Sequence, residues 1–475
     1  MSLPQTPRRS PIGSVGPLPR LIVAVFAAVA LISGVLNLRP LLEGVRGAGV
    51  TAPAAPSAVD RLAGVPARAE TALDARIRSL QDAVREGDER VKGTAATMLG
   101  HAYLQKARET GDPGFYPKAE TLFQQGLAAD GDDVDALVGL GTLALARHQF
   151  AAALDWGEQA RDGNPYHAPA YGVIGDAQIE LGRYDDAVAT VQAMVDLRPD
   201  LGSYSRVSYL RELMGDREGA IVAMEQAAVA GSGYAENVAW VRVQLGNLRF
   251  ESGFLTAAAT DYAAALAAVP GYAPALAGEA RLAAATGDLD RAAALYAEAV
   301  QAIPLPEFVV AYGDVLDAAG RADEAEAQYA LVAAIQQLYT GNGVDTDLEL
   351  ALFTADRGRP EELPGAVEHA RAQVAARPSI VTWDVLAWTL YRSGDLDGAA
   401  AASEQALRLG TRNALMQFHA GTIAAARGET ARAIALLEAA LDLNQHFSVR
   451  YAPEARATLG RLQAQVHVQD AEVTS

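Results

Sequence analysis

One short pattern recurs between residues 165 and 445: a glycine, an alanine five residues later, and often a proline twelve residues beyond that alanine. Successive glycines are 33 to 38 residues apart, at Gly182, Gly215, Gly253, Gly287, Gly320, Gly358, Gly394 and Gly428. The alanines are Ala187, Ala220, Ala258, Ala292, Ala325, Ala399 and Ala433, and the prolines are Pro165, Pro199, Pro270, Pro304 and Pro378. A period of about 34 residues is typical of arrays of helix pairs, so the pattern predicts one elongated helical solenoid.

The unit between Tyr171 and Pro199 shows why the pattern produces two helices. Apolar and small residues at helical spacing run from Tyr171 to Gln178. Gly182 ends this first helix, because glycine adopts a left-handed backbone at little cost. Two aspartates then favour the start of a second helix, whose buried stripe begins at Ala187. Pro199 prevents that helix from continuing.

The same order of residues returns in later units, for example in Gly246, Gly253, Ala258, Tyr262 and Pro270. This spacing resembles the tetratricopeptide repeat, in which W-x2-L-G-x2-Y is followed by alanine, aromatic, alanine and proline positions. Stretches 204–219, 342–353 and 409–420 also resemble one bacterial tetratricopeptide family, which implies the same solenoid and supplies no activity. The resemblance implies an all-α, right-handed α-solenoid of about ten helix hairpins between roughly residues 94 and 445. An alanine-rich bundle without repeats would not keep glycine and alanine in phase.

Some units depart from the pattern. His148 stands where the turn glycine is expected, and histidine tolerates a positive φ better than most residues. A long second helix is expected from Glu324 to Tyr339, followed by the loop 340–349, and another interruption with two prolines spans 359–364. Inserted loops lie on one face of such arrays and are often functional. The alternative is that both loops only adjust the register of the superhelix.

An apolar segment precedes the repeats. Residues 21–38, LIVAVFAAVALISGVLNL, carry no charge. As a helix they would span about 27 Å, close to the thickness of a bilayer's hydrocarbon core. Residues 1–59 hold five arginines and one glutamate, with three arginines before the segment, so the positive-inside rule favours a cytoplasmic N-terminus and a repeat array outside the cytoplasm. We expect a retained, single-pass signal anchor, and the alternatives are a cleaved signal peptide or a buried helix.

These features divide the chain into five parts. In order they are a short basic tail (1–20), a transmembrane helix (21–38), a tether rich in alanine, proline and glycine (39–69), the solenoid (70–450), and a capping helix with the C-terminal tail (451–475). Polar residues on the outer face of the last helix are expected at the end of a solenoid, because this face is exposed to solvent.

Composition and motifs argue against several functions. The chain has no cysteine, which excludes disulfides, thiol catalysis and cysteine-ligated zinc. Its formal net charge of −19 is a poor match for nucleic acid, whose binding depends on basic contacts. Phosphate-loop, HExxH and GxSxG motifs are missing, the histidines are scattered, and the acidic clusters at 130–135 and 345–349 lack the spacing of an EF-hand loop. We expect no enzyme activity, cofactor, metal or small-molecule substrate.

In the tetratricopeptide family the first helix of each hairpin lines the inner face. The resemblance places these residues there: His101, Gln105, Asp176, Glu180, Tyr209, Glu212, Asn247, Phe250, Glu251, Arg281, Asp314, Asp317, Trp388, Tyr391 and Arg392. The candidate partner-binding residues among them are Tyr209, Glu212, Asn247, Phe250, Arg281, Trp388, Tyr391 and Arg392. Asn247 and Arg281 would hold an extended peptide by hydrogen bonds beside aromatic contacts. The alternative is that these aromatic side chains pack within the superhelix. No lysine follows Lys118, so the lysine-based clamp with which some relatives bind chaperone tails is missing.

The leading hypothesis is a membrane-anchored, non-enzymatic scaffold that binds a protein or peptide partner in its groove. One alternative is a structural protein that associates with itself or packs on a membrane complex. Another is a soluble exported adaptor, which follows if the N-terminal segment is cleaved. A third is an enzyme with its site in the loop from Asp345 to Glu349, and no motif supports it.

Overall fold

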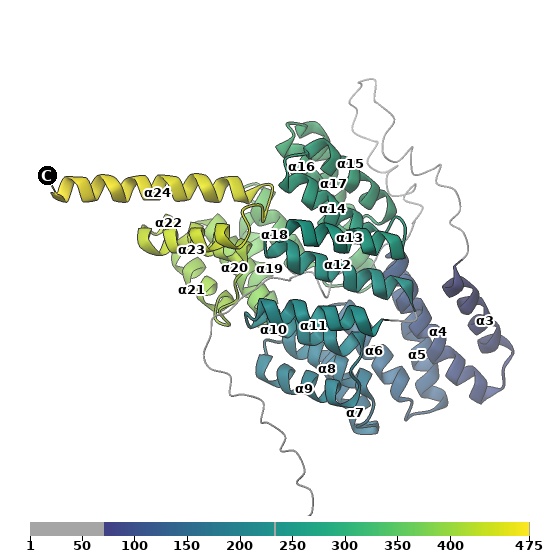
Figure 1. Ribbon diagram of the computed structural model, residues 1–475. Coiled ribbons are helices and arrows are strands. Elements are labelled where there is room, and N and C mark those ends of the chain that lie inside the picture. Colours follow the sequence, from purple (N-terminus) through teal and green to yellow (C-terminus); the bar gives the residue numbers. More distant parts are fainter. Residues whose placement is uncertain (1–70, 232–233, 475) are drawn as a thin grey trace, which may run out of the picture.

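The computed structural model describes residues 71–231 and 234–474, in which every regular element is an α-helix. The first helices of ten hairpins are α4 (Glu89–Thr110), α6 (Val134–Ala146), α8 (Ala168–Glu180), α10 (Leu201–Leu213), α12 (Ala235–Glu251), α14 (Ala273–Ala285), α16 (Pro306–Ala318), α18 (Asp347–Arg357), α20 (Ile380–Ser393) and α22 (Ala414–Ala426). Their second helices are α5 (Phe115–Ala129), α7 (Phe150–Gly163), α9 (Tyr184–Leu197), α11 (Arg217–Ala230), α13 (Leu255–Ala268), α15 (Leu289–Ala302), α17 (Ala322–Gly341), α19 (Leu363–Ala376), α21 (Leu396–Ala406) and α23 (Thr430–Leu443). Helix α3 (Ala72–Glu86) precedes the hairpins and α24 (Tyr451–Thr474) follows them. The prediction of an all-α helical-repeat fold is confirmed (Figure 1).

The turn inside a hairpin depends on one residue with a left-handed backbone. Seven of the eight predicted glycines have φ between 70° and 90°. His148 occupies the same position with a φ of 59°, as its place in the sequence predicts. The prediction of a turn glycine at Gly358 is wrong: its φ is −67°, and a longer connection joins α18 to α19. An extended backbone suffices there because the extra residues reverse the chain.

The predicted alanines mark the closest approach of the helices. All seven are 0% exposed, so a larger side chain at any of them would push two helices apart. Glycine serves the same purpose on the first helices. A Cβ atom at Gly246 or Gly278 would lie 2.5 or 2.4 Å from the ring of Tyr262. One buried aromatic ring of α13 thus packs against the two first helices on either side of it.

Hairpins that are five or six positions apart along the chain also touch. The His148 imidazole donates through Nδ1 to the carbonyl oxygen of Asp345 (2.6 Å), and the amide of Ile380 donates to the Tyr184 hydroxyl (2.8 Å). Further along, the Thr411 hydroxyl donates to the carbonyl of Leu213 (3.0 Å) and the Asn444 side-chain amide to that of Phe250 (2.9 Å). The partners in these contacts are 197, 196, 198 and 194 residues apart.

We call these four contacts the coil junction. In each of them a residue of a hairpin in the first half contacts a residue at the start or the end of a hairpin in the second half. The superhelix therefore coils back on itself, and the green and yellow second half lies against the blue and teal first half (Figure 1). The loop 340–349 belongs to this junction, because the backbone amide of Asp345 also donates to the carbonyl oxygen of Arg147 (3.2 Å).

The regular stack is interrupted once. Helix α17 has 20 residues, whereas the neighbouring second helices α15 and α19 have 14 each. Within the described residues, each second helix packs against the next first helix except α17, which does not pack closely on α18. The predicted long helix from Glu324 to Tyr339 thus corresponds to a gap in the helix packing between two hairpins.

Several predictions concern residues that the structure does not describe. The basic tail 1–20, the transmembrane helix 21–38 and the tether 39–69 all lie outside the described residues. Among the helices that are described, none is long and apolar enough to span a bilayer. At the other end, α24 packs against α22 and α23 of the last hairpin, and its C-terminal part extends beyond them (Figure 1).

Candidate functional site

Two aromatic side chains of the predicted groove are buried. Phe250 is 2% exposed and Trp388 is 1% exposed. Trp388 stacks on the ring of His419, with 4.2 Å between ring centroids, and packs against Tyr391 at 5.0 Å. Both side chains therefore contribute to the packing of the superhelix, and neither offers free surface in this structure. Near the Trp388 end, Arg392 is the exposed residue of the predicted set.

Asn247 and Arg281 lie next to each other and are already bonded to other side chains of the solenoid. The Asn247 side-chain oxygen accepts from the Tyr262 hydroxyl (2.8 Å) and from Arg281 (3.4 Å). Arg281 forms an ion pair with Glu251, and its guanidinium lies 4.2 Å from the ring centroid of Phe250. This group connects α12 to α14. A partner that used these polar groups would have to replace bonds within the solenoid.

The remaining predicted residues are also engaged. Tyr209 is partly buried, and burial raises the pKa of its hydroxyl well above the usual value. Glu212 is 6% exposed. Asp176 binds Arg206 of the next first helix with two hydrogen bonds, of 2.8 and 2.6 Å. The predicted inner face is thus crossed by side-chain bonds that tie successive first helices together.

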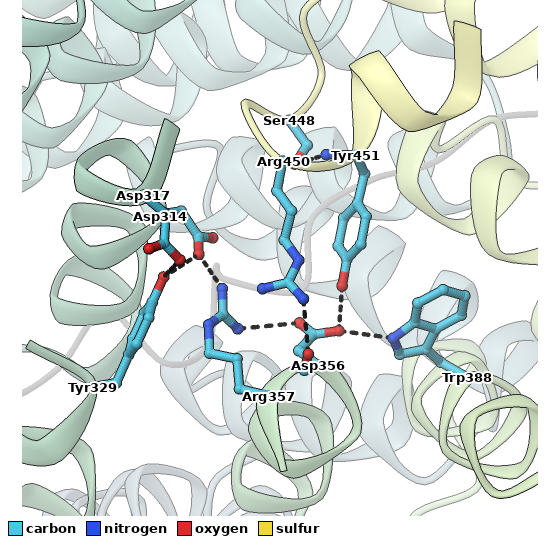
Figure 2. A network of polar contacts seen from close by, with 9 residues as sticks. All are labelled: Asp314, Asp317, Tyr329, Asp356, Arg357, Trp388, Ser448, Arg450 and Tyr451. Atoms are coloured by element: carbon cyan, nitrogen blue, oxygen red, sulfur yellow. Dashed lines mark hydrogen bonds and ion pairs between the residues drawn. The ribbon is translucent and has the colours of Figure 1, made fainter. Parts of the chain in front are cut away.

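A larger polar network lies beside the interruption of the stack (Figure 2). The carboxylate of Asp356, near the end of α18, accepts from the Trp388 indole nitrogen (2.7 Å) and from the Tyr451 hydroxyl. Arg357 forms an ion pair with Asp314 of α16 and lies 3.5 Å from Asp356. The network connects α16, α18, α20 and the start of α24, so it fixes the ends of helices that surround the gap.

More contacts hold this network from both sides. The Tyr329 hydroxyl of α17 donates to Asp314 (2.9 Å) and to Asp317 (3.0 Å), and the Arg450 guanidinium donates to the carbonyl of Asp356 (2.7 Å). Burial raises the pKa of Asp314, while the nearby Arg357 guanidinium opposes that shift. Most of these polar groups have partners within the network, whereas the Nε atom of the buried Arg357 has no hydrogen-bond partner. Burying polar groups costs little only where they are paired.

A cavity of about 230 Å3 adjoins this network, with Asp314, Asp356 and Arg357 in its wall, where α17 and α18 are not closely packed. Its wall comes from α16, α17 and α18, with Ala146 and His148 from the first half of the chain and Val385 from α20. Most lining side chains are apolar: Leu305, Pro306, Val310, Ala311, Val332, Tyr339, Val344, Leu348, Leu352 and Phe353. Pockets for small molecules and cofactors measure roughly 300–1,000 Å3, so this one is better suited to one or two side chains of a partner.

Two carboxylates distinguish the cavity from an ordinary packing defect. Burial raises the pKa of Glu307 to about 7, with a further contribution from the neighbouring Glu349. Among the described residues no cation lies within ion-pair distance of Glu307. The Oε2 atom of Glu349 is buried without a hydrogen-bond partner, and its Oε1 atom is 3.9 Å from Arg377. The cavity therefore combines an apolar wall with one carboxylate, of Glu307, that has no ion pair and another, of Glu349, that has only a long one.

Sequence reasoning missed this cavity as a site. The signals for it were the elongated second helix and the acidic stretch that contains Glu349. The contribution of Ala146 and His148 was not accessible from local patterns, because these residues are about 200 positions away and reach the cavity only through the coil junction.

Stacked helix hairpins with a turn glycine, a buried alanine and a common period define a helical-repeat protein. Two tetratricopeptide repeat family models match, one over residues 144–214 and the other over residues 98–168, 243–305 and 385–446. The chain is a tetratricopeptide repeat protein.

Solved structures that are similar to parts of this chain include three at low identity. A thermophilic tetratricopeptide protein of Thermus thermophilus is 23% identical, covering 38% of this chain and 92% of its own, with a TM-score of 0.34. A tetratricopeptide repeat protein of Parabacteroides merdae is 16% identical, covering 52% and 91%, with a TM-score of 0.39. The APC/C hetero-tetramer Cut9–Hcn1 is 15% identical, covering 82% and 81%, with a TM-score of 0.38. No curated protein matches the chain.

Proposed function

We propose that this protein is a non-enzymatic interaction scaffold that holds a protein or peptide partner on its inner face, with the cavity between α16 and α18 as the anchoring point. The observation that carries the proposal is an apolar cavity at the one place among the described residues where a second helix does not pack closely on the next first helix. Fully desolvated pockets filled by a partner's side chain supply most of the binding energy in protein interfaces.

The polar groups at the cavity support binding better than catalysis. Asp314, Arg357 and Asp356 are bonded to one another, and the Nδ1 atom of His148 is bonded to the Asp345 carbonyl. A nucleophile needs a neighbouring base within hydrogen-bond reach, and the cavity wall holds no such pair among the described residues. The partner-binding role extends to Asn247, Arg281, Tyr391 and Arg392 if the partner continues along the first helices.

A cavity-filling substitution tests the anchoring role. Ala311→Phe places a ring in the cavity, and Ala330→Phe makes the same change at an exposed position of α17. The full-length chain in detergent is incubated with an arrayed library of dodecapeptides, and circular dichroism confirms that each variant is folded. We expect Ala311→Phe to abolish retention of peptides that wild type and Ala330→Phe both bind. Equal retention by all three proteins would refute the cavity as the binding site.

The membrane part of the proposal is supported by the uncharged residues 21–38 and by the arginines that precede them. The proposal is that residues 21–38 are a retained anchor and that the repeat array lies outside the cytoplasm. A reporter fused after Ser475, membrane fractionation and the mass of the mature N-terminus test it together. A soluble exported chain would indicate a cleaved signal, and a reporter inside the cell would reverse the orientation.

A further inference from the structure

Glu307 and Glu349 face the same apolar cavity from different helices. Glu307 lies in the first turn of α16 and Glu349 in the first turn of α18, and each contributes to the cavity wall. Their charges act on each other, which is one of the two reasons that the pKa of Glu307 is raised. The charge on Glu349 thus disfavours the ionisation of Glu307.

The cations nearest to the cavity are already committed. Arg357 is shared between Asp314 and Asp356, and Arg377 donates to the side chain of Gln373 (2.8 Å). Arg377 is 5% exposed at its side chain and lies over the ring of Phe150, so it has little freedom to move closer to Glu349. His148 is kept neutral because burial lowers its pKa. The cavity wall therefore contains four carboxylates, of Glu307, Asp314, Glu349 and Asp356, against one arginine, Arg357.

We propose that the cavity binds a protein or peptide segment in which an aliphatic or aromatic side chain stands next to a lysine or arginine. The apolar side chain fills the space lined by Val310, Leu352 and Phe353, and the neighbouring cation sits between Glu307 and Glu349. This proposal rests on the proposed function and specifies the chemistry of the partner. Charge complementarity selects the partner, because the cation satisfies Glu307 and the unpartnered oxygen of Glu349 at once.

Three peptide pools test the proposal. Each pool contains dodecapeptides with an apolar pair at the centre, followed by two lysines, two glutamines or two glutamates, with all other positions randomised among alanine, serine and glycine. Retention on the full-length chain is measured at about 50 and 300 mM salt. We expect the lysine pool to be retained at least tenfold better than the glutamine pool, with the glutamate pool weakest, and we expect the lysine preference to decrease at the higher salt concentration.

Charge-neutralising variants separate the two proposals. Combined Glu307→Gln and Glu349→Gln should remove the lysine preference and leave retention of the glutamine pool within twofold. The matched control, combined Glu298→Gln and Glu326→Gln, removes two exposed carboxylates and should change nothing. If wild type retained the lysine and glutamine pools equally and Ala311→Phe retained neither, the charge inference would be overturned and the cavity would remain the binding site. Pools that are not retained, or are insensitive to Ala311→Phe, would overturn the proposed function together with the inference.

Discussion

Replacing Thr411 by valine tests whether the coil junction holds the two halves of the superhelix together. Thr411 is 0% exposed, and its hydroxyl donates to the carbonyl of Leu213, 198 residues away, over 3.0 Å. Valine has nearly the same shape, so the substitution removes the donor and leaves a buried carbonyl without a partner. Leaving such a group unsatisfied costs about 1–3 kcal/mol, which corresponds to roughly a 5- to 150-fold increase in the population of the opened junction.

Hydrogen exchange measured by mass spectrometry detects this opening. Amides near residues 210–216 and 408–414 should exchange faster in Thr411→Val by about the same 5- to 150-fold, while amides in α3 and α4 keep their wild-type rates. Thr411→Ser retains the hydroxyl and should restore much of the protection. Thr260→Val is the matched control, because the exposed Thr260 hydroxyl bonds only within its own helix, to Thr256. If Thr411→Val and Thr260→Val gave the same exchange pattern, the junction would not contribute to stability.

Three further predictions concern single side chains. The free energy of unfolding should fall as the pH rises from about 4.5 to about 7, because folded Glu307 holds its proton up to about pH 7. Urea titrations of Glu307→Gln should show a weaker decrease. A pH profile unchanged by this substitution would contradict the raised pKa of Glu307. In calorimetry His148→Ala should have a lower melting temperature than His148→Gly, with a free energy of unfolding about 1–2 kcal/mol smaller. Both variants lose the imidazole hydrogen bond, but only alanine is strained at a φ of 59°. Identical melting temperatures would contradict the argument from backbone strain. Trp388→Phe should destabilise by about 1.5–3 kcal/mol, because Asp356 loses its indole donor, and Trp240→Phe, a partly buried control, should lose less in the same urea titration.

The hairpins were predictable from the sequence because their determinants are local. A glycine that must take a left-handed backbone and an alanine that must fit between helices repeat once in each unit, and both requirements are met at the predicted positions from Gly182 to Ala433. Even His148 follows from the register alone. Gly358 deviates because the connection after α18 is longer, which removes the need for a tight turn.

The inner face was less predictable. A register assigns a side chain to a helix face, but it does not say how close the next helix comes, so Phe250 and Trp388 were assigned to a groove and are buried. The coil junction depends on the small rotation between successive hairpins. This rotation accumulates over about six hairpins, and its total cannot be predicted from any local sequence pattern. The cavity between α16 and α18 needs both kinds of information, because its wall combines a local insertion with residues from the distant α6–α7 turn.

The coil junction also sets the number of repeats in this protein. Solenoids usually gain and lose units easily, because each unit touches only its neighbours. Here four contacts join residues that are 194 to 198 positions apart, so adding or deleting one unit of about 34 residues between His148 and Asn444 would misalign the contacts that span the change. We therefore expect insertions and deletions of whole repeats only outside the interval from His148 to Asn444, so that the number of repeats within it stays constant.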